Sequence, residues 1–176
     1  MKVKLLFKAL TVAFVSIITC AGLYAQGNLA PPAGVPAPTM KTLDQVEPRT
    51  PISSLPYTIS EPGSYYVTGN LSSTEHGIII QSSGVTVDLM GFSLTGEGGS
   101  GDDGIYVDGS TNAVIDRVII KGGSISGFSD GLFCEYMNNS RIEGLVVSGN
   151  SNYGIFLSGR SGGQCNGNTI ADCTIS

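Results

Sequence analysis

The sequence has a single histidine, His76, and few charged residues, which make up 13% of its 176 residues. One histidine excludes a histidine-rich metal site and argues against a Ser/His/Asp triad. We expect His76 to be a solvated turn residue before Gly77. Glycine, by contrast, is abundant, with 25 residues. A chain that is poor in charge and rich in glycine is typical of a turn-rich all-β protein rather than of a helical or disordered one.

Basic residues are also few, nine against fourteen acidic ones, which gives a net charge of −5. Residues 1–25 hold three of the lysines and no acidic residue, so the rest of the chain has 6 basic and 14 acidic side chains, a net charge of −8. Nucleic-acid binding needs a basic surface, so we expect no nucleic-acid partner. The acidic balance suits divalent cations, or serves solubility alone.

Residues 1–25 have the pattern of a secretory signal peptide. Three lysines precede an uncharged, mostly apolar run from Ala9 to Leu23, and Ala25 offers a small residue at a cleavage point before Gln26. The alternative is an uncleaved membrane anchor, for which the apolar run is short. The prediction is a secreted or cell-envelope protein with no membrane span in the mature chain.

The sequence has four cysteines. Cys20 lies in the signal peptide, and the other three, Cys134, Cys165 and Cys173, leave at least one unpaired. Cys134 and Cys173 fit as small apolar residues of a core. A Cys165–Cys173 bridge stays open, and the spacing matches no zinc site.

One short phrase, a glycine followed by three mostly apolar residues, returns four times. It occurs as Gly77-Ile78-Ile79-Ile80, Gly104-Ile105-Tyr106-Val107, Gly131-Leu132-Phe133-Cys134 and Gly154-Ile155-Phe156-Leu157. The glycines are 27, 27 and 23 residues apart, a spacing typical of solenoids. Each period holds short β-branched segments separated by Gly, Asn, Ser and Asp turns. The sequence therefore predicts an all-β solenoid, a parallel β-helix.

The parallel β-helix is predicted to span residues 57–176. Residues 26–56 precede it as a Pro/Ala-rich tether, whose second half is expected either to lie along the first coil or to form an N-terminal cap. The final Cys173-Thr174-Ile175-Ser176 stops inside an expected strand. We therefore expect the helix to be truncated at its C-terminus.

A second phrase follows the first in each period, as Val87-Asp88, Ile115-Asp116, Ile142-Glu143 and Ile170-Ala171. Equivalent positions of a β-helix stack about 4.8 Å apart. Asp88, Asp116 and Glu143 are therefore predicted to form one outward column. Stacked carboxylates repel one another, so the column either binds a cation such as Ca²⁺ or is a solvated acidic face with salt bridges.

The segment Gly98–Tyr106 fits the glycine-rich nonapeptide that binds calcium in tandem repeats. Asp102 and Asp103 are its candidate metal ligands. Only one copy is present, so the alternative is an acidic turn that joins two coils. Asp130 likewise precedes a repeat glycine, which keeps a weak oxygen-ligand site open at these turns.

Three aromatic residues, Tyr106, Phe133 and Phe156, share one position of the first phrase. Side chains alternate along a strand, so these three face opposite to Ile105, Leu132 and Ile155. Either the aromatic set or the aliphatic set must point outward. An exposed aromatic column is unusual for a plain surface and could stack on sugar rings, so we predict a carbohydrate-binding face here.

Several segments resemble exported bacterial right-handed parallel β-helix repeat proteins, a superfamily that includes pectate lyases. They are Glu61-Pro62-Gly63-Ser64-Tyr65-Tyr66, Val85-Thr86-Val87-Asp88-Leu89 and Gly122-Gly123-Ser124-Ile125-Ser126-Gly127. The resemblance covers about residues 57–176 and implies a right-handed helix. It also implies that the protein binds or processes polysaccharide, and that an enzyme of this kind is a polysaccharide lyase or a glycoside hydrolase.

Lyases of this superfamily hold calcium with aspartates and use an arginine or lysine as the base. Arg117, Arg141 and Arg160 are available, but none lies in a lyase motif, which argues against lyase activity. The alternative function is a non-catalytic structural or adhesive module at the cell surface.

Overall fold

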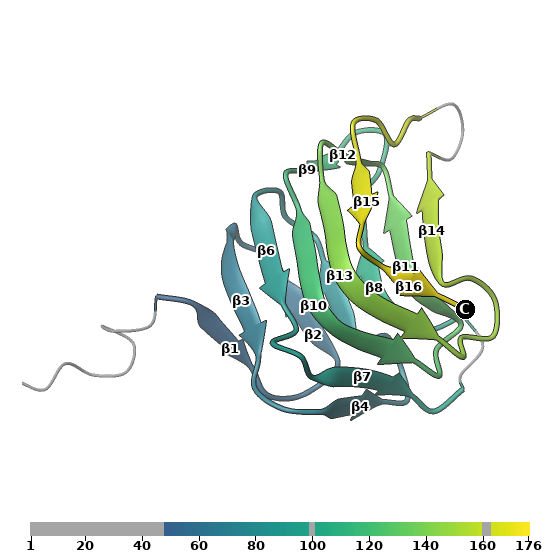
Figure 1. Ribbon diagram of the computed structural model, residues 1–176. Coiled ribbons are helices and arrows are strands. Elements are labelled where there is room, and N and C mark those ends of the chain that lie inside the picture. Colours follow the sequence, from purple (N-terminus) through teal and green to yellow (C-terminus); the bar gives the residue numbers. More distant parts are fainter. Residues whose placement is uncertain (1–47, 99–100, 160–162) are drawn as a thin grey trace, which may run out of the picture. The chain divides into compact units, whose positions relative to one another are not determined.

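The computed structural model describes residues 48–98, 101–159 and 163–176, and this part of the chain is built of parallel strands (Figure 1). One sheet of nine strands comprises β1 (Thr50–Ile52), β3 (Gly63–Val67), β4 (Leu71–Ser73), β6 (Val85–Asp88), β7 (Ser93–Gly96), β10 (Ile119–Ser126), β13 (Arg141–Ser148), β15 (Thr169–Ala171) and β16 (Thr174–Ile175). A sheet of five strands comprises β2 (Tyr57–Ile59), β5 (Ile78–Ile80), β8 (Asp103–Val107), β11 (Asp130–Glu135) and β14 (Ile155–Ser158). A short sheet pairs β9 (Ile115–Asp116) with β12 (Met137–Asn138).

The chain winds from one sheet to the next and returns one strand further along, which makes a parallel β-helix. In the five-stranded sheet, Ile105 of β8 pairs with Ile78 of β5 and with Leu132 of β11, and Leu132 pairs with Ile155 of β14. The predicted fold and the four-fold glycine phrase are therefore confirmed. In this described part of the chain, no helix is long and apolar enough to cross a membrane.

The core consists of stacked aliphatic columns inside the helix. Alternation along each strand turns every second residue inward. The inward residues with no exposed surface include Ile78, Val87, Leu94, Ile105, Ile120, Ile125, Leu132, Cys134 and Val147. Cys134 is thus a core residue, as predicted, and Cys173 packs against the same core while partly exposed.

The repeat glycines are required by the close approach of successive coils. A Cβ atom at Gly104 would lie 2.7 Å from the carbonyl oxygen of Gly131, and one at Gly131 would lie 2.5 Å from that of Gly154. A Cβ at Gly77 would likewise collide with the carbonyl of Gly104. The phrase therefore begins with glycine because a side chain would push the coils apart.

The structure corrects the second phrase. Lys121 of β10, not Asp116, lies between Asp88 and Glu143, because it pairs with both of them in register. Asp116 instead pairs with Asn138 in the two-stranded sheet. The predicted column of three carboxylates is therefore wrong, and its central position is a lysine.

The cause of the error is a longer path between β8 and β10 in this coil. Residues 108–118 separate β8 from β10, whereas only residues 136–140 separate β11 from β13, so Ile115 lies in β9 and does not take the position of Ile142. That position belongs to Ile120. Gly122 and Gly144 then turn the next corner with the same left-handed backbone, at φ values of 67° and 61°.

Candidate functional site

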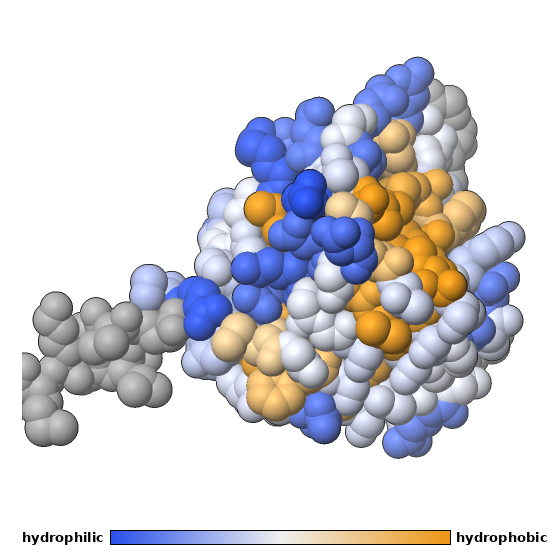
Figure 2. All heavy atoms as spheres, viewed as in Figure 1, coloured by the Kyte–Doolittle hydropathy of each residue, from blue (hydrophilic) through white to orange (hydrophobic). Residues whose placement is uncertain are grey.

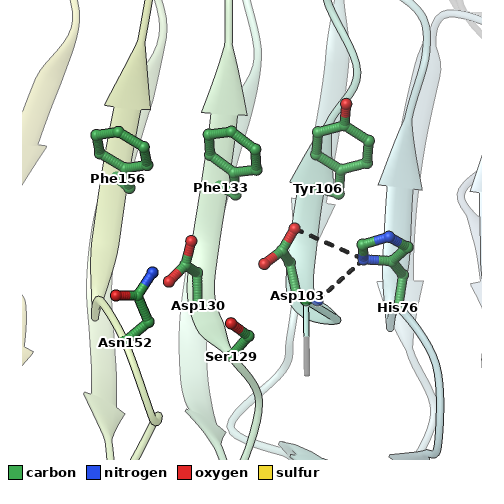
Figure 3. Close-up of a pocket in the computed structure, with 9 residues that line it drawn as sticks. His76, Asp103, Tyr106, Ser129, Asp130, Phe133, Asn152 and Phe156 are labelled. Carbon is green, nitrogen blue, oxygen red and sulfur yellow. Dashed lines mark hydrogen bonds and ion pairs between the residues drawn. The ribbon is translucent and has the colours of Figure 1, made fainter. Parts of the chain in front are cut away.

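A hollow of about 420 Å³ lies on the outer face of the five-stranded sheet, across β5, β8, β11 and β14 (Figure 3). This volume is within the range of small-molecule sites. We call it the groove. It is lined by His76, Gly101, Asp103, Tyr106, Ser129, Asp130, Phe133, Asn152 and Phe156. These side chains make two parallel rows, one aromatic and one polar.

The aromatic row is the predicted column of Tyr106, Phe133 and Phe156. The three side chains point outward and are partly exposed, while Ile105 and Leu132 are fully buried. Strand alternation therefore places the aromatic set outside and the aliphatic set inside, as the prediction of an exposed aromatic column requires. The Tyr106 and Phe133 rings are 5.6 Å apart at an interplanar angle of 16°, and the Phe133 and Phe156 rings are 5.3 Å apart at 7°.

The spacing of these rings leaves part of each ring face open. Parallel rings in full face-to-face contact would lie about 3.5 Å apart. At more than 5 Å between centroids the rings are not in full face-to-face contact, and an offset is the arrangement that aromatic pairs prefer. Figure 3 shows them side by side across three neighbouring strands. His76 extends the row at one end, stacked 5.3 Å from Tyr106, and Tyr153 stacks 4.9 Å from Phe156 at the other.

The polar row runs beside the rings and comes from the positions just before the repeat glycines. Asp103 pairs in register with Asp130, and Figure 3 shows His76 and Asn152 on either side of this pair. Asp103 and Asp130 are 4% and 6% exposed. Two nearly buried carboxyl groups thus stand next to each other at the base of the groove.

Hydrogen bonds from neutral groups hold this row. The backbone N–H of Asp103 donates to Nδ1 of His76 at 2.9 Å, and the backbone N–H of Tyr153 donates to Oδ1 of Asp130 at 2.9 Å. Nδ1 of His76 also lies 3.6 Å from Oδ2 of Asp103. Because Nδ1 accepts a hydrogen bond, the neutral imidazole carries its proton on Nε2.

Burial raises the pKa of Asp103 from 3.8 to about 7. The neighbouring charge of Asp130 contributes to this rise after burial, and a hydrogen bond from the backbone N–H of Asp130 partly opposes it. Like charges this close disfavour double ionisation. Asp103 is therefore about half protonated near pH 7 and mostly protonated at lower pH.

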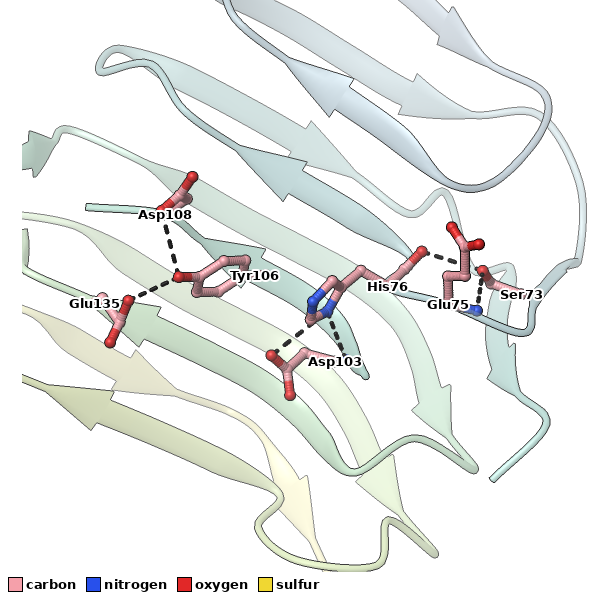
Figure 4. A network of polar contacts seen from close by, with 7 residues as sticks. All are labelled: Ser73, Glu75, His76, Asp103, Tyr106, Asp108 and Glu135. Carbon is pink, nitrogen blue, oxygen red and sulfur yellow. Dashed lines mark hydrogen bonds and ion pairs between the residues drawn. The ribbon is translucent and has the colours of Figure 1, made fainter. Parts of the chain in front are cut away.

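A second set of carboxylates lies on the far side of the rings (Figure 4). The hydroxyl of Tyr106 donates to Oε2 of Glu135 at 2.7 Å and lies 3.3 Å from Oδ1 of Asp108. Nε2 of Gln81 donates to Oδ2 of Asp108 at 2.9 Å. Burial and the hydrogen bond to Glu135 raise the pKa of Tyr106 well above its ordinary value, which keeps this ring neutral.

The outer face of the nine-stranded sheet has a different pattern, in which each acid meets a base. Asp88 is 3.3 Å from Nζ of Lys121 and 3.9 Å from the Arg49 guanidinium, and Glu143 pairs with Arg141. Figure 2 shows this hydrophilic face, with hydrophobic residues gathered toward the strands β15 and β16. Asp88 and Glu143 therefore match the second of the two alternatives predicted for them, a solvated acidic face with salt bridges.

The structure separates the predicted calcium ligands. Asp88 and Glu143 lie on the nine-stranded sheet, Asp116 pairs with Arg117 at 2.5 Å in the two-stranded sheet, and Asp103 faces the groove. Asp102 follows the turn before β8. Among the described residues, no three His, Cys, Asp or Glu side chains are grouped as metal ligands. Calcium binding at these residues stays a prediction, and Arg160 lies outside the described residues.

Among the groove residues that were not candidate site residues, two have ionisable side chains, His76 and Asp130. His76 was expected to be a solvated turn residue, but it is partly buried and stacks on Tyr106. Asp130 was considered only as a turn acid and as part of a weak oxygen-ligand site. The signal that identifies both is position, because His76, Asp103 and Asp130 each stand immediately before a repeat glycine.

The three cysteines in the described part of the chain form no disulfide, since Cys134, Cys165 and Cys173 are all free thiols. The Cys165 thiol lies 4.0 Å from the backbone oxygen of Cys134. Burial raises the pKa of the Cys134 thiol far above its ordinary value, so Cys134 is inert packing in the core.

Fold and groove together define a right-handed parallel β-helix protein with an open face on one sheet. The family model described as right handed beta helix region matches residues 66–176, more than half of the chain. The chain therefore belongs to this family, as the resemblance indicated. No curated protein and no solved structure matches it. Family membership supports a carbohydrate-related or structural β-helix protein.

Proposed function

We propose that this protein is exported and binds polysaccharide chains along the groove. The observation that carries the proposal is the row of offset rings of Tyr106, Phe133 and Phe156 on three successive coils. A linear chain of sugar rings lying along the helix axis meets one aromatic ring on each coil. The apolar C–H faces of a sugar ring cover the partly open ring faces, and the polar row accepts hydrogen bonds from hydroxyl groups.

Export follows from residues 1–25, whose lysines, apolar run and small residue at Ala25 match a signal peptide. A protein that binds polysaccharide outside the cytoplasm would meet cell-wall or extracellular polymers. Sequencing the N-terminus of the protein recovered from the culture medium or cell envelope tests this part. A mature chain that begins at Gln26 supports it, and a chain that keeps Met1 contradicts it.

The carboxyl pair supports a second candidate, cleavage of the bound chain. Hydrolysis of a glycosidic bond needs one carboxylic acid that donates a proton and one carboxylate that acts as a base or nucleophile. Asp103 holds a proton up to about pH 7, and Asp130 is the neighbouring carboxylate. Binding without cleavage, in a structural or adhesive role, uses the same aromatic row.

Affinity electrophoresis of the mature chain in gels that contain neutral, acidic or amino-sugar polymers tests binding. We expect Phe133→Ala and Phe156→Ala each to weaken retardation about tenfold, since each removes one stacking partner. Val146→Ala is the matched control, because Val146 is an exposed apolar residue on the other face, 47% exposed on β13. Equal retardation of all variants, or none of the wild type, would leave the structural role as the better account.

A further inference from the structure

The charges around the groove are of one sign. Asp103 and Asp130 lie on one side of the aromatic row, and Asp108 and Glu135 lie on the other. Among the described residues that line the groove there is no lysine or arginine, and His76 is the one basic side chain. The described basic residues that pair with acids, Arg49, Arg117, Lys121 and Arg141, lie outside the five-stranded sheet.

The carboxyl pair is nearly buried, yet the hydrogen-bond donors that the structure shows for it are neutral backbone N–H groups. Asp130 accepts the backbone N–H of Tyr153, and Asp103 accepts the backbone N–H of Asp130. Backbone dipoles satisfy hydrogen bonds without cancelling the net charge. A buried carboxylate is normally paired with a cation or remains protonated. The base of the groove therefore favours a bound cation and opposes a bound anion.

We propose that the groove selects polysaccharides whose sugars carry protonated amino groups, and that Asp103 and Asp130 determine this selection. The inference rests on the proposed function, because the aromatic row supplies the sugar-binding surface. An ammonium group on the edge of a stacked sugar would face the two carboxyls and form charge-assisted hydrogen bonds with them. The carboxylate of a uronic acid at the same place would add a like charge beside this nearly buried pair, so polyuronates are excluded.

Proton release accompanies this binding. An ammonium group stabilises the ionised form of both carboxyls, so the pair gives up the proton that it holds in the free protein. A neutral sugar has no such effect. Proton release therefore distinguishes an ammonium ion placed against the pair from one attracted weakly to the acidic surface elsewhere.

Isothermal titration calorimetry of the mature chain at pH 6 tests the proposal with three oligosaccharides of equal length. Two share one linkage and differ only in the amino group, a glucosamine oligomer and its N-acetylated form, and the third is an oligogalacturonate. We expect the glucosamine oligomer to bind about tenfold more tightly than the acetylated one, and the oligogalacturonate not to bind. Titration in buffers of different ionisation enthalpy should show proton release for the glucosamine oligomer alone.

Variants assign the selection to the groove. Asp103→Asn combined with Asp130→Asn keeps the shape of both side chains and is expected to reduce the tenfold preference to within about threefold. It should also abolish proton release. Asp88→Asn removes a charge from the other face and should leave both the preference and the proton release unchanged.

The outcomes separate the two levels of the proposal. If the acetylated oligomer binds and the glucosamine oligomer binds no better, or if the oligogalacturonate binds as well, the selection is wrong and the sugar-binding function stands. If the preference persists in the doubly substituted variant, Asp103 and Asp130 do not determine it. If no oligosaccharide binds, both the selection and the proposed function are overturned.

Discussion

On the nine-stranded sheet, Asp88 lies near Lys121 and Arg49, whereas on the five-stranded sheet Asp103 lies beside a second acid, Asp130. Both faces are built from the same coils, and in both most inward residues are aliphatic. The difference is therefore confined to the outward positions. A face that balances its charges needs no ligand, while a face that stacks acids beside aromatic rings loses stability unless something binds there.

The largest expected effect concerns the stacking on which both faces depend. Gly104→Ala places a Cβ 2.7 Å from the carbonyl oxygen of Gly131 and against the side chain of Ile125, so the coils must separate. We expect a loss of about 3 kcal/mol in the free energy of unfolding, measured by urea denaturation followed by circular dichroism. Gly69→Ala is the control, because no atom lies within 4 Å of its added Cβ. Equal stability of the two variants would contradict this account of the repeat glycines.

The next effect has opposite signs on the two faces. The pKa of Asp103 is raised from 3.8 to about 7, so the folded protein holds more protons than the unfolded chain between these values. The contribution of Asp103 to the free energy of unfolding is therefore fully present below about pH 4. It is lost progressively as the pH rises to about 7, and above that pH it no longer changes. Asp103→Asn removes the ionisation, and at pH 8 it should stabilise the protein by on the order of 2 kcal/mol, with little effect at pH 4.

Asp88→Asn is the matched variant on the other face. Asp88 accepts the backbone N–H of Met90 at 2.9 Å and pairs with Lys121, so its replacement should destabilise the protein by about 1 kcal/mol. Thermal unfolding of both variants from pH 4 to pH 8 compares them directly. The groups around Asp103 that also titrate are Asp130, Asp102, Glu135 and His76, and they are common to all the proteins compared. A stabilisation by Asp88→Asn, or a loss by Asp103→Asn at pH 8, would remove the contrast between the faces.

A smaller effect follows from converting the balanced face into an acidic one. Lys121→Glu places a carboxylate between Asp88 and Glu143, with which position 121 pairs in register. Like charges on neighbouring strands repel, so we expect a loss of about 1 kcal/mol, against less than half of that for Lys121→Gln. Millimolar Ca²⁺ should restore the melting temperature of the glutamate variant and not of the glutamine variant. No calcium effect on either would show that three stacked acids alone do not make a cation site here.

Position 121 also marks the limit of what the sequence could predict. The glycine phrase was aligned correctly because its cause, the contact between coils, repeats at every turn. The shared outward position of the Tyr106 and Phe133 rings could be predicted from this alignment and from strand alternation. Ile115-Asp116 was misaligned because it resembles Ile142-Glu143, and two residues cannot distinguish a strand of the main sheet from a short strand before it. The buried state of Asp103 depends on the packing of neighbouring coils, which no local pattern reports.

The smallest expected effect tests whether an exposed ion pair matters at all. The Arg117 guanidinium lies 2.5 Å from Asp116, but the Arg117 side chain is 69% exposed, so water and salt screen the pair. Arg117 has a left-handed backbone with a φ of 55°, and alanine retains the Cβ atom that makes this conformation costly. Arg117→Ala should therefore change the free energy of unfolding by less than about 0.5 kcal/mol. A loss above about 1 kcal/mol in urea denaturation, equal to that of Asp88→Asn, would mean that the short β9–β12 sheet depends on this pair as the nine-stranded sheet depends on its own.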